Sequence, residues 1–151
     1  ILQSQDISLN QDLLKFFFDI TNGSPGIVNE YDFDETLHLF EKLVYSIIDF
    51  DPFSKSNSEL IELLSSFEND KLKIYLSLLK FILITIDKSK LNINIEDTYL
   101  SNDILKIKKI SDKISRNIIH NKLEYLINNE NDLFTFNLDK KIFMINFFVE
   151  R

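Results

Sequence analysis

Apolar residues recur every three or four positions along most of the chain, which is the spacing of amphipathic α-helices. Polar runs, a proline and candidate capping residues separate these periodic stretches. Residues 88–102 lack the periodicity and are expected to form a loop, and residues 103–110 to form a helical turn or two. The pattern predicts an all-α fold with helices over residues 10–21, 25–31, 34–49, 58–68, 71–87, 111–131 and 138–150.

The stretch 71–87 is apolar on nearly every side, from Leu72 to Ile86. A helix without a polar face lies either at the centre of a protein core or within a membrane. This stretch contains Lys73 and Lys80, and it is shorter than the roughly 20 apolar residues that span a bilayer. The pattern therefore favours a central core helix over a membrane segment, and we expect no membrane partner.

The sharpest turn signal is Gly23-Ser24-Pro25-Gly26. The chain has two glycines and two prolines, and both glycines and one of the prolines lie in this stretch. Gly23 is suited to end a helix in the left-handed conformation. Ser24 is suited to cap the next helix and Pro25 to occupy its first position. The stretch predicts a corner between two packed helices.

Composition limits the function classes. The chain has 151 residues, no cysteine and a net charge of −7. Disulfides and thiolate metal sites are thereby excluded, which suits a reducing compartment such as the cytoplasm. The negative charge argues against a general nucleic-acid surface. Because the chain starts Ile-Leu-Gln without methionine or a signal sequence, it has the look of a fragment of a longer protein.

No catalytic or metal-binding pattern emerges. His38 and His120 lie on predicted helices without neighbouring ligands, and structural roles are expected for both. Asp32, Asp34 and Glu35 suit a helix start better than a cation site, which needs more oxygen ligands from a shaped loop. No phosphate-binding glycine loop is present, so no cofactor and no metal are expected.

One basic cluster stands out in this acidic chain: Lys106, Lys108, Lys109, Lys113, Arg116 and Lys122. Such a cluster can contact DNA phosphates, or it can simply form a solvated face. The overall negative charge favours the solvated face.

Two segments carry a family resemblance. The Gly23–Gly26 corner resembles the corner in the lid domain of bacterial clamp-loader subunits. The segment from Lys122 to Leu126, together with the run Phe136-Asn137-Leu138-Asp139-Lys140-Lys141, is similar to the end of the delta prime family of DNA polymerase III. There, a long helix is followed by an Asn-Leu-Asp/Asn-x-Lys/Gln corner and a closing amphipathic helix. The order of elements between these segments also agrees.

The resemblance implies a division into two parts. Residues 1–30 would be the end of an AAA+ lid domain, and residues 31–151 a helical collar domain of about five helices. In ATP-hydrolysing members of the family, the corner carries an arginine that senses the nucleotide. Gly26 occupies that position here, as in a non-hydrolysing subunit.

The implied function is assembly. The collar domain would bind other clamp-loader subunits during DNA replication, while the sliding clamp and DNA would be contacted only through an AAA+ domain absent from this sequence. Phe143, Phe147 and Phe148 are the expected interface residues, because they cannot all point inward together with Leu138, Ile142 and Ile145.

Two other hypotheses remain open at this point. A stand-alone helical adaptor or regulatory domain that binds a partner helix would have one continuous core that includes residues 1–30. An enzyme with a site in the bundle core is disfavoured, because no polar cluster converges in the sequence.

Overall fold

Residues 33–47, 51–91, 109 and 112–149 are described by the computed structural model of the chain. These residues contain five α-helices and no strand, so the all-α prediction is confirmed for this part. The Gly23–Gly26 corner and the whole proposed lid segment, residues 1–30, lie outside the described residues. The helices are α3 (Phe33–Ser46), α4 (Lys55–Ser65), α5 (Asn69–Lys90), α7 (Arg116–Thr135) and α8 (Lys140–Val149).

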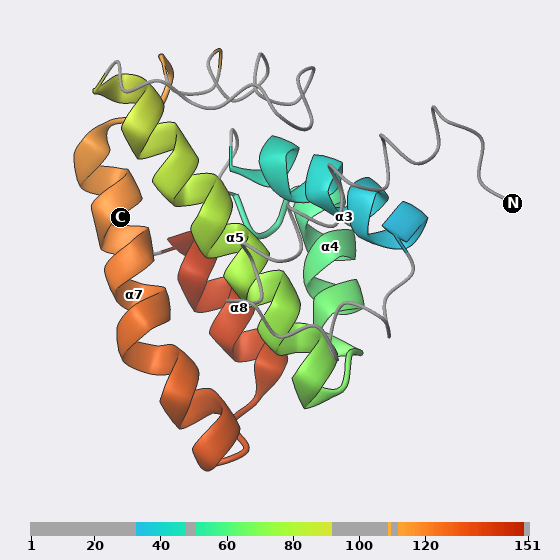
Figure 1. The fold of residues 1–151 in the computed structure, drawn as a ribbon. Helices are drawn as coiled ribbons and strands as arrows, with labels where there is room; N and C mark the ends of the chain where they lie inside the picture. The colour runs from blue at the N-terminus through green and yellow to red at the C-terminus, as the bar shows by residue number, and fades with distance from the viewer. Residues whose placement is uncertain (1–32, 48–50, 92–108, 110–111, 150–151) are drawn as a thin grey trace, which may run out of the picture.

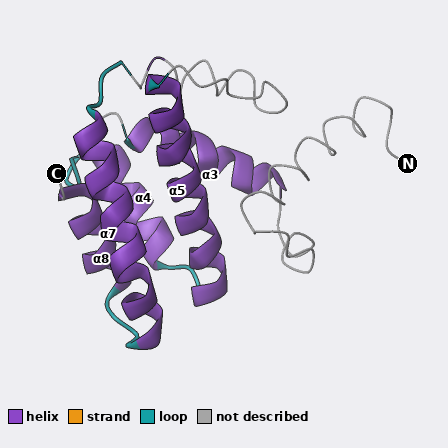
Figure 2. Ribbon diagram, turned by 60° about the vertical axis from the view of Figure 1, so that its left-hand side comes forward, coloured by secondary structure: helices purple, strands orange, loops and turns teal. Residues whose placement is uncertain are grey.

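The central helix is α5. It packs against α3, α4 and α7, while α8 packs against α4 and α7. Figures 1 and 2 show α5, α7 and α8 running lengthwise and α3 lying across them. Buried residues lie on several sides of α5, among them Leu72, Leu78, Leu79 and Ile82. The expectation of a central core helix is therefore confirmed, and none of the described helices is both long and apolar enough to cross a bilayer.

Two serines start helices at positions other than those predicted. The Ser54 hydroxyl accepts a hydrogen bond from the Asn57 backbone N–H at 3.3 Å, so α4 begins at Lys55 rather than Ser58. The Ser115 hydroxyl accepts from the Ile118 N–H at 3.3 Å, so α7 begins after Ser115 rather than at Ser111. In both cases several serines precede the apolar stripe, and the pattern alone does not identify which one is the N-cap.

The predicted break between α4 and α5 exists, but it lies at residues 66–68 rather than at Asn69-Asp70. Both residues belong to the first turn of α5, where the carboxylate of Asp70 is favoured by the positive end of the helix dipole. At the other end α5 continues to Lys90, past the predicted end at Asp87. Lys88 and Lys90 lie in that last turn, where a positive charge is favourable.

The corner between α7 and α8 is a Schellman motif. Asn137 has a backbone φ of 50°, in the left-handed region. The Leu138 N–H donates to the Leu133 carbonyl oxygen at 3.0 Å, which is the long-range hydrogen bond of this motif. Asp139 then caps α8, because its Oδ1 accepts from the Ile142 N–H at 2.9 Å. Asn137 thus terminates α7 and Asp139 caps α8, so the last helix begins at Lys140 rather than at the predicted residue 138.

Two lysines attach the start of α8 to α4 and to the turn that follows α4. Lys140 Nζ donates to the Phe67 carbonyl oxygen at 2.6 Å. Lys141 Nζ forms an ion pair with Glu62 of α4. The run Asn137-Leu138-Asp139-Lys140-Lys141 thus ends one helix, starts the next and positions it against α4.

We expect Asn137→Ala to lower the free energy of unfolding by about 1–2 kcal/mol, because alanine is disfavoured in the left-handed region. Asn137→Gly is expected to change it by less than about 0.5 kcal/mol, since glycine adopts positive φ readily. Urea denaturation followed by circular dichroism measures both. The matched control is Asn128→Ala on the exposed side of α7. If Asn137→Ala costs no more than the control, the corner does not depend on this conformation.

Candidate functional site

The inner face of α8 is fully packed into the core. Phe143, Met144, Phe147 and Phe148 are all buried. The expectation that the three phenylalanines lie on an exposed interface face is therefore corrected. Their spacing of four and one residues places them on one side of the helix, towards α4 and α7.

The outer face of α8 is also apolar. Leu138, Ile142, Ile145 and Val149 follow one another at spacings of four, three and four residues, and we call them the outer stripe. Leu138, Ile142 and Val149 are 47%, 58% and 55% exposed, and Ile145 is half-buried. The last helix therefore has two apolar faces, as the sequence pattern indicated, but the assignment of inner and outer residues was reversed.

A buried lysine fixes the C-terminal end of α8. Lys122 on α7 is 0% exposed. Its Nζ donates to the carbonyl oxygens of Phe147 at 2.6 Å and Phe148 at 3.0 Å. These carbonyls belong to the last described turn of α8. The same Nζ lies 5.1 Å from the centre of the Phe147 ring.

Tyr125 adds a second contact from α7 to α8. Its hydroxyl donates to the Phe143 carbonyl oxygen at 2.9 Å. Its ring centre lies 5.2 Å from that of Phe143 and 6.3 Å from that of Phe147. Lys122 and Tyr125 are one turn apart on α7, so a single face of α7 holds the inner side of α8 and leaves the outer stripe free of these contacts.

The predicted basic cluster does not form one solvated face. Lys122 lies in the core, and Lys106 and Lys108 are outside the described residues. Lys109 and Lys113 are exposed. Arg116 is engaged by Asp87 of α5, with Nε 2.7 Å from Oδ1 and a second contact of 3.4 Å to Oδ2.

Asp87 joins α5 to the start of α7 through two partners. The hydrogen bond from Arg116 lowers the pKa of the Asp87 carboxyl below its ordinary value of 3.8, and His120, whose Nε2 lies 3.2 Å from Oδ1, lowers it further. A lowered pKa means that the folded state favours the carboxylate. The contribution to stability is present above pH 3.8 and is lost as the pH falls through the lowered pKa.

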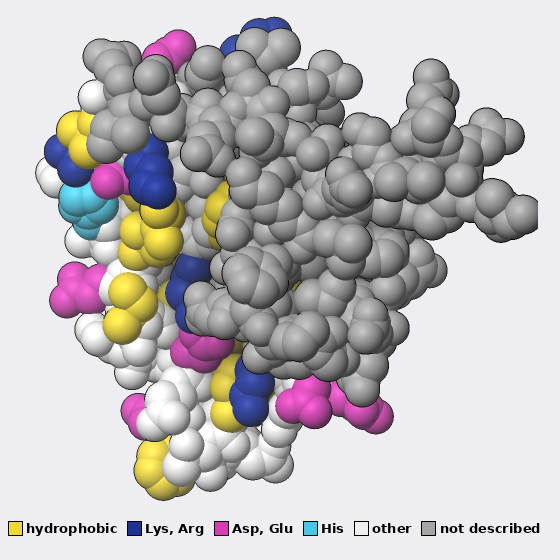
Figure 3. Space-filling model, viewed as in Figure 1, with side chains coloured by type: hydrophobic (Ala, Val, Ile, Leu, Met, Phe, Trp, Pro, Cys, Tyr) yellow, Lys and Arg dark blue, Asp and Glu magenta, His cyan; other side chains and the backbone are white. Residues whose placement is uncertain are grey.

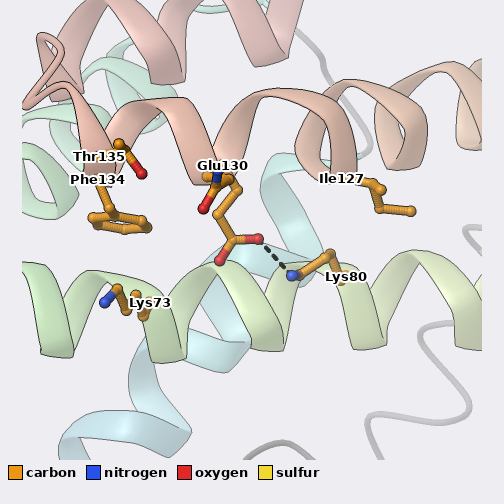
Figure 4. A pocket seen from close by; sticks show the side chains of 7 residues that line it. Lys73, Lys80, Ile127, Glu130, Phe134 and Thr135 are labelled. Atoms are coloured by element: carbon orange, nitrogen blue, oxygen red, sulfur yellow. Dashed lines mark hydrogen bonds and ion pairs between the residues drawn. The ribbon is translucent and has the colours of Figure 1, made fainter.

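A second surface feature is the groove between α5 and α7. Figure 3 shows basic, acidic and hydrophobic side chains gathered along this side of the molecule. The groove has a volume of about 540 Å³. Figure 4 shows Glu130 reaching from α7 to Lys80 on α5, with Nζ and Oε2 2.5 Å apart, and Lys73 near Phe134. The Lys73 Nζ lies 5.0 Å from the centre of the Phe134 ring.

The residues considered for metal binding do not come together in the part of the chain that is described. His38 on α3 and His120 on α7 are both exposed. Asp34 and Glu35 lie in the first turn of α3, and Asp32 precedes the described residues. No group of three or more His, Asp or Glu side chains that could hold a metal ion occurs among the described residues.

Comparisons with protein-family models, with curated proteins and with solved structures find no match to this chain. The argument about function therefore rests on the residues and contacts described above. Of these, the outer stripe of α8 is the candidate functional site.

Sequence reasoning missed the role of Lys122. A basic residue among Asn121, Leu123 and Glu124 gives no sign of burial. The signal that was available is its place in the apolar stripe of α7: Lys122 comes three residues after Ile119 and four before Leu126, both buried. A lysine within such a stripe is a candidate for a buried helix-capping role.

We expect Lys122→Met to lower the free energy of unfolding by about 1–3 kcal/mol, because two buried carbonyl groups lose their donor. Methionine fills a similar volume, so a cavity contributes little. Urea denaturation gives the free energy, and amide hydrogen exchange reports on the last turn of α8. Lys113→Met is the control, since Lys113 is exposed. A Lys122→Met variant as stable as the wild type would contradict the capping role.

Proposed function

We propose that this chain is a non-catalytic assembly module whose C-terminal helix binds a helix of a partner protein through the outer stripe. The observation that carries this proposal is the second apolar face of α8. The inner face of α8 is already packed in the core. The outer stripe therefore contributes much less than the inner face to the stability of the fold.

The spacing of the outer stripe suits a helical partner. Ile142, Ile145 and Val149, at spacings of three and four on α8, form a seam that a facing helix fills with its own side chains. Leaving such a seam in water is unfavourable, and burial of one aliphatic side chain is worth about 1.5–3 kcal/mol. The inner contacts with Lys122 and Tyr125 hold the helix in a defined orientation, which reduces the ordering cost of binding.

The more specific proposal is a collar domain of a bacterial clamp loader of the delta prime type, which would bind other clamp-loader subunits during DNA replication. The resemblance in sequence supports it. Its two C-terminal segments coincide with α7 and with the corner before α8. The corner residues Asn137, Asp139 and Lys140 each make a contact that positions α8, which gives a physical reason for that run of residue types.

The proposal also accounts for the lack of a cation in the Gly23–Gly26 corner. A lid with Gly26 in place of the sensor arginine has no group there to compensate phosphate charge. A subunit of this kind would contribute to the complex by position and contact. Its partners would be the neighbouring subunits, with the sliding clamp and DNA contacted by other parts of the complex.

The test is co-expression of the 151-residue chain with the other clamp-loader subunits of its source organism, followed by affinity purification. We expect the wild type to co-purify with them. The double variant Ile142→Ser and Val149→Ser should weaken this association at least about tenfold, because two aliphatic contacts are lost. Its free energy of unfolding should stay within about 0.5 kcal/mol of the wild type, since both residues are exposed.

The matched control is Phe53→Ser. Phe53 is the most exposed large apolar residue described and lies in the loop between α3 and α4, outside the outer stripe. This variant should co-purify like the wild type. Failure of the wild-type chain to bind any clamp-loader subunit would reject the collar proposal. Undiminished binding by the double variant would reject the proposal that the outer stripe is the binding surface.

A further inference from the structure

The groove between α5 and α7 is independent of the outer stripe. The described residues that line it belong to α5 and α7, whereas the outer stripe consists of Leu138 in the corner and three residues of α8. In Figure 1 α5 and α7 lie in front of α8. A ligand of the groove would therefore leave the outer stripe accessible.

The groove combines two apolar side chains with polar and charged ones, and basic groups outnumber acidic ones among its described residues. Ile127 is exposed, and Phe134 is half-buried and packs against the core. Lys73 and Lys80 provide two ammonium groups, and Glu130 provides the one carboxylate among the described residues that line the groove. The local charge is thus opposite to the net charge of −7 of the whole chain.

The two lysines differ in their availability. Lys80 is held by Glu130 across the groove. Lys73 is exposed and lies over the Phe134 ring, and no carboxylate of the described residues forms an ion pair with it. Lys73 can therefore accept an anionic group, and the neighbouring ring and Ile127 offer apolar contact beside it.

From this arrangement we propose that the groove binds an amphipathic helix of a partner protein that carries carboxylates beside its apolar residues. An amphipathic helix can lie along a groove between two packed helices, and its apolar face would cover Phe134 and Ile127. Lys73 and Lys80 are two helical turns apart, about 10 Å along α5. Carboxylates about two turns apart on the partner match this spacing. The proposal does not depend on the proposed function of the outer stripe.

Glu130 limits the affinity of the groove for an acidic helix. Its carboxylate occupies Lys80 and repels an incoming carboxylate. The residue therefore selects against weakly acidic helices that lack enough apolar contact. Removing its charge should improve binding, which distinguishes this arrangement from a groove that merely tolerates any helix.

The experiment measures binding of fluorescently labelled model peptides to the full chain by anisotropy. One peptide of about 18 residues, long enough for several helical turns, has leucines on one face and glutamates beside them. The second peptide has lysines in place of the glutamates. We expect the glutamate peptide to bind more tightly than the lysine peptide, and the difference to shrink as salt is raised.

Four variants locate the contact. Lys73→Glu should weaken binding of the glutamate peptide about fivefold or more, and Glu130→Gln should strengthen it. Lys88→Glu, on the same helix but outside the groove, makes the same charge change and should have no comparable effect. Ile142→Ser in the outer stripe should leave binding unchanged. Urea denaturation of each variant separates loss of binding from loss of fold.

Four results would overturn the proposal, and the first three concern the peptides and the lysine variants. They are equal binding of both peptides, absence of binding to the wild type, and equal weakening by Lys73→Glu and Lys88→Glu. If Ile142→Ser abolishes peptide binding while Lys73→Glu does not, the peptide occupies the outer stripe, and the groove proposal fails while the stripe proposal stands.

Discussion

The hydrogen bonds from Lys122 to the Phe147 and Phe148 carbonyls fix the orientation of α8. That orientation determines which apolar residues of α8 are exposed at the surface. Both faces of α8 are apolar, so hydrophobic burial alone does not strongly distinguish one rotation of the helix from another. A buried donor placed on α7 supplies the directional preference. It stabilises the rotation of α8 in which these carbonyls and the phenylalanine rings contact α7. In that rotation the outer stripe faces water.

The other end of α8 is fixed by equally specific contacts. Asn137 reverses the chain, Asp139 satisfies an N–H of the first turn, and Lys140 joins the corner to the turn between α4 and α5. A short helix held at both ends and along one face is a rigid platform. Such a platform can present apolar residues to a partner with little loss of conformational entropy on binding.

The sequence was sufficient to predict the fold class, the central place of α5 and the two apolar faces of α8, because helical periodicity determines all three. It did not determine where α4 and α7 begin, because several serines compete for each cap and only packing selects among them. It also misassigned Phe143, Phe147 and Phe148 to the outer face. Periodicity shows that two faces exist, but it does not identify the one that packs inward, where Lys122 contacts the carbonyls of Phe147 and Phe148.

The most direct test of this account measures which face of α8 is accessible. The chain has no cysteine, so each single cysteine substitution introduces the one thiol that can be labelled. Thiol labelling of Ile142→Cys and Val149→Cys should proceed at nearly the rate of an unfolded chain, while labelling of Phe143→Cys and Phe147→Cys should be slower by about 100-fold or more, as expected for sites that react only on opening. Rapid labelling at positions 143 and 147 together with protection at 142 and 149 would contradict the orientation of α8 and, with it, the proposed assembly surface.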